Sequence, residues 1–398
     1  MTMKLNVVFL HPDLGIGGAE RLVVDAAVAM KESGHSVRFV TNHHSVSHCF
    51  EETRDGTLPV TVVGDWLPRT VFGKCYALCS YARMVYAALY LTFFTSINPD
   101  VVFVDQISAC IPILNWMPCK VLFYCHYPDQ LLAAHDDALK RYYRLPLDWL
   151  EEKTTACAHM ILVNSNFTLN VFKSTFKSIK TLPIVVYPSI NTASFDNTET
   201  IQLKDFMNMD NCKYILSINR FERKKNLGLA IHSFNLLSDK KIKLVLAGGY
   251  DPLNLENIEY FHELVNLVRD MNLNERVIFL KSPSDALKIS LLRHCLCLVY
   301  TPSFEHFGIV PLEAMYCCKP VVAVNNGGPK ETIENDHNGY LRNAEPDDFA
   351  DAIKQLVEVE GKAEIFGNCG KKRFDDTFSF GAFKNKIDSI LNNLYKSE

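Results

Sequence analysis

Glu305 and Glu313 are two carboxylates with seven residues between them, in a segment where an apolar strand pattern is followed by a helical pattern. Gly308 precedes the helical pattern, so free N–H groups at the helix start could receive a phosphate. Carboxylates accept hydrogen bonds from hydroxyl groups. The spacing therefore favours a site for a ligand that carries both sugar rings and phosphates.

Each glutamate also has a simpler interpretation. Glu313 could be an exposed helix residue, and Glu305 could be an acid that caps a turn. The second alternative is weaker, because Phe304 and Phe307 flank Glu305 and predict partly dry surroundings.

Two cations follow another apolar strand pattern, Tyr214 to Ser217. Arg220 stands at the end of this pattern, and Lys225 opens the helical pattern that comes next. Two such cations could converge on one diphosphate. For Arg223 and Lys224, between them, we expect solvated side chains.

Glycines mark two turns after strand patterns. Gly17 and Gly18 lie between the first apolar run and the helical pattern from Leu22 to Lys31, and Gly248 and Gly249 follow a later run. Glycine allows a backbone to approach a ligand closely, but these residues could equally mark tight turns. Nicotinamide binding is disfavoured, because an acidic residue replaces the last glycine of G-x-G-x-x-G, and no Walker motif is present.

His126 follows the apolar run from Val121 to Cys125. A lone histidine there is either a ligand contact or a hydrogen-bonded structural residue. The sequence has no D-x-D motif and no His, Cys or carboxylate cluster with metal-ligand spacing. We therefore predict no bound metal and no cofactor.

Short apolar runs alternate with helical patterns along the chain, which is typical of parallel sheets flanked by helices. A polar stretch, Asn191 to Asn211, separates two such series. We expect an α/β domain at residues 1–195, joined by a C-terminal helix at 378–398, and a second α/β domain at 196–377. The expected strands are Leu5 to Leu10, Val37 to Thr41, Val60 to Val63, Val101 to Val104, Val121 to Cys125, Met160 to Val163, Ile184 to Tyr187, Tyr214 to Ser217, Lys243 to Ala247, Val277 to Leu280, Leu296 to Tyr300, Val321 to Val324 and Tyr340 to Leu341.

The segment from Tyr76 to Ile97 is apolar and aromatic, but Arg83 interrupts it. The uninterrupted part is shorter than the roughly 20 residues that a membrane span needs. It could be a buried helix, or it could lie in a membrane interface with Arg69, Lys74 and Arg83 near the lipid headgroups. The residues alone slightly favour the buried helix.

Charge and cysteine content exclude further classes. The net charge of −4 over 398 residues provides no positive field for a nucleic-acid backbone. The 13 cysteines have irregular spacing with no C-x-x-C, which indicates reduced thiols in a cytosolic environment.

Several motifs, taken in order, resemble those of retaining glycosyltransferases with the GT-B fold. Glu305 and Glu313 match the E-x7-E pattern of that family, and Arg220 with Lys225 matches its Arg and Lys pair. The family's glycine loops resemble Gly17-Gly18-Ala19-Glu20 and Asn326-Gly327-Gly328-Pro329-Lys330-Glu331. The resemblance covers nearly the whole chain and implies two Rossmann-like domains whose parallel sheets face each other across a crevice.

Three further stretches resemble the dolichol-pathway α-1,3/1,6-mannosyltransferases: His11 to Arg21, Phe123 to Asp129 and Ser303 to Gly308. This resemblance implies transfer of α-1,3- and α-1,6-linked mannose from GDP-mannose to a dolichyl-diphosphate oligosaccharide. It also implies the cytosolic face of the endoplasmic reticulum membrane, with the membrane surface and other mannosyltransferases of that pathway as candidate partners. An embedded acceptor raises the interfacial interpretation of Tyr76 to Ile97 above the buried one.

The resemblance also assigns roles to residues. It implies that Glu313 binds the donor ribose, while Glu305 and His306 contact the mannose. His126 contacts the sugar near the reacting carbon, and Arg220 and Lys225 stabilise the departing diphosphate. Catalytic roles are expected for Glu305, His126, Arg220 and Lys225, and donor binding for Gly17, Gly18, Arg220, Lys225, Glu305, His306, Phe307, Gly308 and Glu313.

Other functions remain open from the sequence alone. The main alternative is a GT-B retaining glycosyltransferase with a different nucleotide sugar or a soluble acceptor. A nucleotide-sugar 2-epimerase would need no lipid acceptor, and a scaffold subunit would bind no GDP-mannose.

Overall fold

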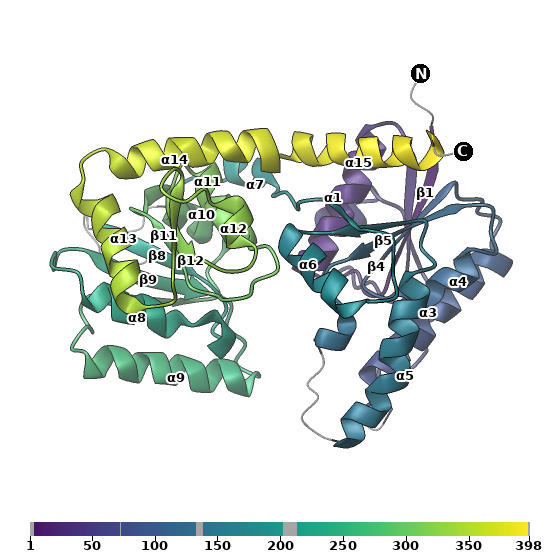
Figure 1. Cartoon of the computed structure of the whole chain (residues 1–398), viewed down its shortest axis with the longest axis horizontal. Coiled ribbons are helices and arrows are strands. Elements are labelled where there is room, and N and C mark those ends of the chain that lie inside the picture. The colour runs from purple at the N-terminus through teal and green to yellow at the C-terminus, as the bar shows by residue number, and fades with distance from the viewer. Residues whose placement is uncertain (1–3, 72, 133–137, 202–212, 397–398) are drawn as a thin grey trace. The chain divides into compact units, whose positions relative to one another are not determined.

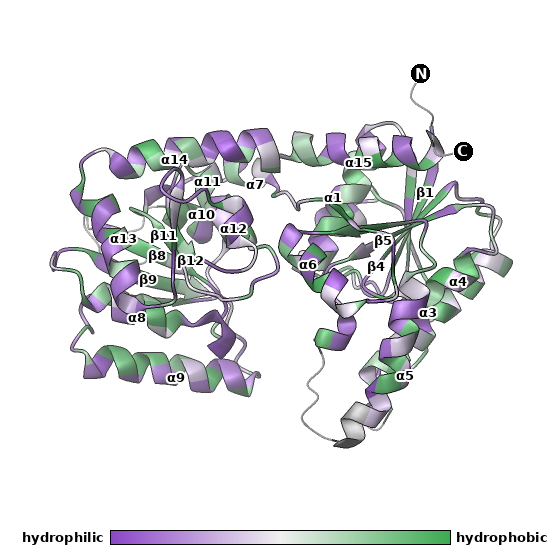
Figure 2. Cartoon of the chain, in the orientation of Figure 1, coloured by the Kyte–Doolittle hydropathy of each residue, from purple (hydrophilic) through white to green (hydrophobic). Residues whose placement is uncertain are grey.

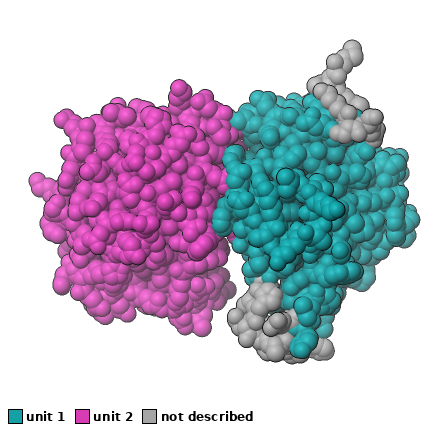
Figure 3. All heavy atoms as spheres, viewed as in Figure 1, with its two compact units in different colours: residues 1–188, 381–398 teal, residues 189–380 magenta. Residues whose placement is uncertain are grey.

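The computed structural model describes residues 4–71, 73–132, 138–201 and 213–396. The chain divides into two compact units (Figure 3). Unit 1 comprises Met1–Pro188 and Gly381–Glu398, and unit 2 comprises Ser189–Phe380.

Unit 1 contains a parallel sheet of seven strands in the order β3-β2-β1-β4-β5-β6-β7 (Figure 1). Parallel strands are covered on both faces, so they consist of nearly continuous apolar residues, which the sequence displays. The first three run Asn6–His11 (β1), Ser36–Thr41 (β2) and Val60–Val62 (β3). The others are Val101–Asp105 (β4), Lys120–Cys125 (β5), Met160–Val163 (β6) and Ile184–Val185 (β7).

The helices of unit 1 are α1 (Gly18–Glu32), α2 (Glu51–Arg54), α3 (Tyr76–Phe93), α4 (Ile111–Leu114), α5 (Ala138–Thr155), α6 (Asn166–Thr175) and α15 (Phe380–Lys396), with 3₁₀ turns at Ser108–Cys110 and Asp129–Leu131. The expected return of the C-terminal helix to the first domain is confirmed, because α15 packs on unit 1. Ser33 donates a hydrogen bond to Asp388 at 2.7 Å, and the Tyr395 hydroxyl donates to the carbonyl of Asp100 at 2.7 Å.

Unit 2 contains a parallel sheet of six strands in the order β10-β9-β8-β11-β12-β13. They run Tyr214–Ile218 (β8), Lys243–Gly248 (β9), Val277–Lys281 (β10), Leu298–Tyr300 (β11), Val321–Val324 (β12) and Gly339–Arg342 (β13). All thirteen expected strands thus occur in the two sheets, with ends that differ by two residues at most.

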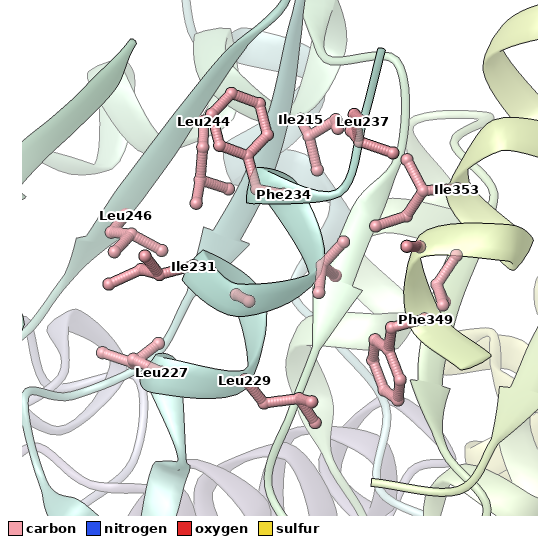
Figure 4. Packing of buried hydrophobic residues seen from close by; sticks show 14 of the residues in the cluster. Ile215, Leu227, Leu229, Ile231, Phe234, Leu237, Leu244, Leu246, Phe349 and Ile353 are labelled. Atoms are coloured by element: carbon pink, nitrogen blue, oxygen red, sulfur yellow. The ribbon is translucent and has the colours of Figure 1, made fainter. Parts of the chain in front are cut away.

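The helices of unit 2 are α7 (Thr192–Asn197), α8 (Leu227–Asn235), α9 (Leu255–Asp270), α10 (Asp285–His294), α11 (Ile309–Tyr316), α12 (Pro329–Thr332), α13 (Pro346–Glu358) and α14 (Lys362–Arg373), with a 3₁₀ turn at Arg223–Lys225 and a π-helical turn at Phe374–Phe378. Helix α8 is central to the core, where Ile231 and Phe234 are fully buried among side chains from β8, β9 and α13 (Figure 4). Burial of such side chains stabilises each by about 1.5–3 kcal/mol.

The division between the units falls before the expected boundary at residues 195 and 196. Helix α7 packs on unit 2, because Phe195 is buried there and Asp196 accepts a 2.5 Å hydrogen bond from the Tyr316 hydroxyl. Arg293 donates to the carbonyl of Thr198 at 3.0 Å. Residues 202–211 of the polar stretch lie outside the described residues.

Helix α3 covers most of the apolar segment from Tyr76 to Ile97. Met84 and Leu91 are fully buried in the core of unit 1, whereas Tyr76 and Phe93 are exposed by 62% and 60%. The green colour of hydrophobic residues appears on much of α4 and on parts of α3 and α5 (Figure 2). Among the described residues, no helix combines the length and the apolar character of a membrane span. One face of α3 is therefore buried in unit 1. The expected place of Arg83 near lipid headgroups is wrong, because this side chain is buried and donates to the carbonyl of Asn42. The interfacial interpretation now concerns the C-terminal end of α3, where Phe93 is exposed.

The cysteines that the structure describes are all free thiols. Most of them are buried, and burial raises the pKa of the Cys110 thiol to about 12. The expectation of reduced thiols agrees with this arrangement.

Candidate active site

Lys225 and Glu305 form an ion pair in unit 2, with 2.5 Å between Lys225 Nζ and Glu305 Oε2. Both side chains are mostly buried, with exposed fractions of 12% and 25%. The Thr301 hydroxyl donates to the carbonyl of Lys225 at 2.7 Å, which fixes the lysine backbone beside the loop after β11. A group bound by one of the two charges therefore lies within reach of the other.

The position of Lys225 differs in one respect from the prediction that it opens a helix. It ends the 3₁₀ turn Arg223–Lys225, and α8 begins only at Leu227. The cause is Asn226, whose left-handed backbone (φ 48°) separates the turn from the helix. Asparagine tolerates this conformation better than most residues do.

Arg220 forms a different ion pair. Its side chain is 61% exposed, and its guanidinium lies 2.9 Å from the carboxylate of Glu222. Arg223 and Lys224 have the exposed side chains that we expected and form ion pairs at the surface. The structure thus joins Lys225 to a glutamate of the E-x7-E pattern, whereas convergence of Arg220 and Lys225 on one ligand stays a prediction.

Glu313, on α11, is not an exposed helix residue. Its exposed fraction is 8%, and its Oε1 lies 2.9 Å from Lys288 Nζ on α10. Burial lowers the pKa of Lys288, but the Glu313 carboxylate more than offsets this and raises it above its ordinary value. Glu313 Oε2 is buried and has no hydrogen-bond partner in the described part of the chain. A buried acceptor without a partner is costly, so this oxygen suits a ligand hydroxyl.

Two glycine positions fix the loop that carries Glu305. The Gly327 backbone is left-handed (φ 65°), and a Cβ atom at Gly328 would lie only 2.2 Å from the backbone of Phe307. The Gly328 N–H donates to the carbonyl of Glu305 at 2.8 Å. The glycine loop after β12 therefore holds the Glu305 loop by direct backbone contact.

Gly308 directly precedes α11, as expected, and has a φ of 89°. Phe307 is buried and His306 partly buried, while Phe304 is 66% exposed. The prediction of partly dry surroundings for Glu305 is confirmed by its exposed fraction of 25%, although of the two aromatic residues only Phe307 is buried. The Phe304 backbone has a φ of 57°, a conformation that aromatic residues rarely adopt and that is often found at functional sites.

The second glycine turn, Gly248 and Gly249, has a structural explanation. A Cβ atom at Gly248 would lie 1.9 Å from the carbonyl oxygen of Asn219, so only glycine fits beside the end of β8. At Gly249 a Cβ atom would lie 3.2 Å from the side chain of Arg220. Gly248 therefore admits the chain's own backbone, whereas Gly249 lies against the side chain of Arg220.

In unit 1, Gly17 and Gly18 stand at the start of α1. A Cβ atom at Gly17 would lie 2.2 Å from Glu20 Oε2, whereas nothing lies within 4 Å of a Cβ atom at Gly18. The helix has fifteen residues, so its start carries the free N–H groups expected of a long helix. Gly18 leaves this helix start open.

His126 belongs to a charged cluster at the carboxyl ends of three neighbouring strands. His11 ends β1, Asp105 ends β4, and His126 directly follows β5. Asp105 Oδ1 lies 2.6 Å from His11 Nδ1, and Asp105 Oδ2 lies 3.1 Å from His126 Nε2. The bond to Asp105 agrees with the structural alternative for His126, whereas its contact with the sugar stays a prediction. The His126 side chain remains 19% exposed.

Sequence reasoning missed three of these partners: His11, Asp105 and Lys288. The first two directly follow the predicted strands Leu5 to Leu10 and Val101 to Val104, and the carboxyl ends of neighbouring parallel strands usually lie at the same edge of a sheet. That rule would have identified them. Lys288 carries no such signal, because it lies on a helix far from Glu313 in the sequence.

Among the described residues, no group of three or more His, Cys, Asp or Glu side chains could hold a metal ion. The absence of a catalytic metal stays a prediction.

Curated relatives align with almost the whole chain. The α-1,3/1,6-mannosyltransferase ALG2 of Homo sapiens is 48% identical, and the alignment covers 96% of this chain and 95% of the human protein. ALG2 of Saccharomyces cerevisiae is 43% identical, with 98% of this chain and 85% of the yeast protein covered. The chain belongs to the ALG2 α-1,3/1,6-mannosyltransferase family.

Family models and solved structures agree with this assignment. The model "Glycosyltransferase Family 4" matches residues 16–194, and "Glycosyl transferases group 1" matches residues 201–373. Sucrose-phosphate synthase from Thermosynechococcus elongatus has a TM-score of 0.77 at 18% identity, with 99% of this chain and 100% of that chain covered. Anabaena HepE in complex with UDP has a TM-score of 0.75 at 18% identity, with 98% and 100% covered. The chain thus has the GT-B fold, and the expected fold class and the expected mannosyltransferase class are confirmed, whereas retention and the use of GDP-mannose stay predictions.

Proposed function

We propose that this ALG2-family glycosyltransferase transfers mannose from GDP-mannose to a dolichyl-diphosphate oligosaccharide, with α-1,3 and α-1,6 linkages and with retention. The proposal rests on one observation: the chain is 48% and 43% identical to two α-1,3/1,6-mannosyltransferases over nearly its whole length. The ion pair and the buried carboxylate of unit 2 support it with a suitable site.

The reaction displaces a diphosphate from an anomeric carbon, so negative charge grows on the departing GDP. Lys225 is the cation best suited to that charge, since it is mostly buried and electrostatic interactions strengthen away from water. Arg220 and the N–H groups at the start of α11 would bind the same diphosphate. No metal is required when these groups neutralise the leaving group.

Binding of a diphosphate would change the partner of Lys225. Its ammonium group would pair with phosphate oxygens, and Glu305 would then accept hydrogen bonds from mannose hydroxyls. His306, Phe307 and Gly308 belong to the same loop and would line the donor. Loading of the donor would thus release Glu305 for recognition of the sugar.

Glu313 and Lys288 suit the ribose. Glu313 Oε2 lacks a partner among the described residues, and a ribose hydroxyl would supply the missing hydrogen bond. Lys288 holds the other carboxylate oxygen and keeps the side chain in place. We propose that Gly17 and Gly18 of unit 1 approach the donor and that His126 contacts the mannose.

We also propose that the chain acts at the cytosolic face of the endoplasmic reticulum membrane, where its lipid-linked acceptor resides. Aromatic side chains at the end of α3 support a membrane contact. Phe93, Phe94 and Trp116 are exposed by 60%, 74% and 67%, and the rings of Phe93 and Trp116 lie 6.0 Å apart. Such aromatic clusters favour the interface between water and lipid.

A transfer assay tests the proposal directly. Purified full-length protein is incubated with GDP-mannose and a phytanyl-diphosphate acceptor that carries the one-mannose core, and the products are analysed by mass spectrometry. A gain of two hexoses supports the proposal. If the protein transfers sugar only from another nucleotide sugar, the main alternative is supported. Conversion of the sugar nucleotide in the absence of an acceptor would indicate an epimerase. A protein that does not bind GDP-mannose would be a scaffold subunit.

A further inference from the structure

The cluster of His11, Asp105 and His126 in unit 1 has a hydrogen-bond pattern that determines where its protons lie. Asp105 is 1% exposed, and each of its carboxylate oxygens faces a different histidine. An ionised carboxylate only accepts hydrogen bonds. Both ring nitrogens that face Asp105 must therefore carry hydrogen.

His11 has a second acceptor on its other side. Its Nε2 lies 2.8 Å from the carbonyl oxygen of Asp13, and a carbonyl oxygen also only accepts. Both nitrogens of the His11 ring thus carry hydrogen, and the ring is an imidazolium. Burial lowers the pKa of His11, but Asp105, Glu20 and the Asp13 carbonyl more than offset this and raise it. The charge of His11 accordingly balances the charge of Asp105.

Asp105 stays ionised for the same reason. Burial raises the pKa of this carboxyl group, but His11 and His126 outweigh the effect and hold it below its usual value. Two hydrogen-bond donors that face a buried carboxylate favour its charged form. Asp105 can therefore act as a permanent acceptor for His126.

His126 donates through Nε2, and this leaves Nδ1 as the ring nitrogen with a lone pair. Within the described residues, its ring forms no other hydrogen bond. The Asn164 side chain donates to the His126 carbonyl at 3.1 Å, and the Tyr124 ring lies 4.8 Å from the imidazole ring. Asp105, Tyr124 and Asn164 thus hold both the backbone and the ring of His126.

We propose that Asp105 is a positioning residue, which holds His126 as the neutral tautomer with hydrogen on Nε2, so that Nδ1 accepts a hydrogen bond from a substrate hydroxyl. His11 is its counter-ion and keeps the carboxylate charged. This inference rests on the proposed function, which assigns His126 to the mannose. It adds the direction of that hydrogen bond: the sugar donates and the protein accepts.

The tautomer can be measured without the reaction. In NMR spectra of protein with ¹⁵N-labelled histidine, the couplings between the ring nitrogens and the hydrogens on the ring carbons distinguish protonated from unprotonated nitrogens. The signals that are missing in His126→Gln belong to His126. We expect His126 with hydrogen on Nε2 and an unprotonated Nδ1 at about pH 7.5. In Asp105→Asn, whose amide can donate to Nε2, we expect this pattern to weaken or reverse. Hydrogen on Nδ1 of His126 in the wild type would overturn the inference.

Kinetics test whether Asp105 acts through His126. We expect Asp105→Asn to lower kcat at least tenfold while the KM for GDP-mannose changes less than threefold. In a His126→Ala background, the same change should lower kcat less than twofold further, because the residue that Asp105 orients is already absent. If the losses in kcat from Asp105→Asn and His126→Ala multiply in the double variant, Asp105 does not act through His126, and the positioning role is contradicted.

A control variant distinguishes the loss of His126 positioning from a general structural effect. Asp25 is also a buried, ion-paired carboxylate of unit 1, so Asp25→Asn measures the cost of such a change elsewhere, and we expect its kcat within twofold of the wild type. Equal losses in Asp25→Asn and Asp105→Asn would mean a general structural effect and would overturn the inference. A wild type that transfers no mannose would contradict the proposed function, while the tautomer measurement still decides the geometry.

Discussion

At the scale of single residues, Lys225 and Glu305 form the contact that the proposed chemistry uses most directly. Their 2.5 Å separation gives two opposite charges in mostly buried surroundings. The side chains offer a cation and an acceptor at one place, which suits the charged and hydroxyl groups of a ligand. The neighbouring Lys224 is 66% exposed and pairs with Glu222, which makes it a natural control.

Replacement of Lys225 by alanine should abolish most of the transfer activity. We expect Lys225→Ala to reduce kcat about 100-fold or more, because one buried group that stabilises developing negative charge contributes about this much. Lys224→Ala should stay within twofold of the wild type. Steady-state kinetics with GDP-mannose, together with melting temperatures, measure both variants. A folded Lys225→Ala protein with normal kcat would remove Lys225 from the mechanism.

The charge of His11 predicts how the stability of the fold depends on pH. The pKa of His11 in the folded protein is raised above the ordinary value of about 6.5. The stabilisation that its charged form provides is therefore complete below about pH 6.5 and declines as the pH rises through the folded-state pKa. The groups that face it are Asp105, Glu20 and the Asp13 carbonyl. Urea unfolding between about pH 6 and pH 9 should therefore show a loss of stability that His11→Gln lacks. Identical pH profiles for the two proteins would contradict a charged His11.

At the scale of elements, the strands were the most predictable feature of the chain. Parallel strands are covered on both faces, so each gives an apolar run that is visible in the sequence. Contacts between distant segments give no such signal. Lys288 and Glu313 meet only because α10 and α11 are neighbours, and the membership of α7 in unit 2 depends on where Phe195 is buried.

The glycine loop after β12 is an element whose role the structure explains. Gly328→Ala would place a Cβ atom 2.2 Å from the Phe307 backbone, so the Glu305 loop must shift. We expect a loss of transfer of at least tenfold, since a displacement of about 1 Å can cost 100-fold in rate. Gly228→Ala, in α8 with its nearest contact at 3.8 Å, is the matched control and should remain active. Equal activity of both variants would show that the contact does not position Glu305.

Helix α3 leads to a prediction about membranes. If its exposed end contacts lipid, Phe93→Ser combined with Trp116→Ser should reduce binding to vesicles of phosphatidylcholine and phosphatidylinositol several-fold, because the apolar area available for burial is lost. Leu253→Ser in unit 2, at a side chain that is 93% exposed, should bind as the wild type does. Vesicle flotation measures all three proteins. Unchanged flotation of the double variant would exclude this end of α3 as the contact.

At the scale of the whole molecule, each of the two α/β units contains its own set of candidate groups. Unit 2 contains Lys225, Glu305 and Glu313, and unit 1 contains His126 with its buried carboxylate partner. The sequence motifs identified the candidate residues, whereas the structure revealed the partners that hold them in place. The central claim is that these fixed groups, without a metal ion, withdraw the diphosphate from the sugar.

Transfer in the presence of a chelator tests that claim most directly. The protein is dialysed against EDTA, and hexose addition from GDP-mannose to the one-mannose acceptor is followed by mass spectrometry with and without added Mg²⁺ or Mn²⁺. We predict addition of two hexoses at an unchanged rate in EDTA. Activity that disappears in EDTA and returns with either ion would contradict the account.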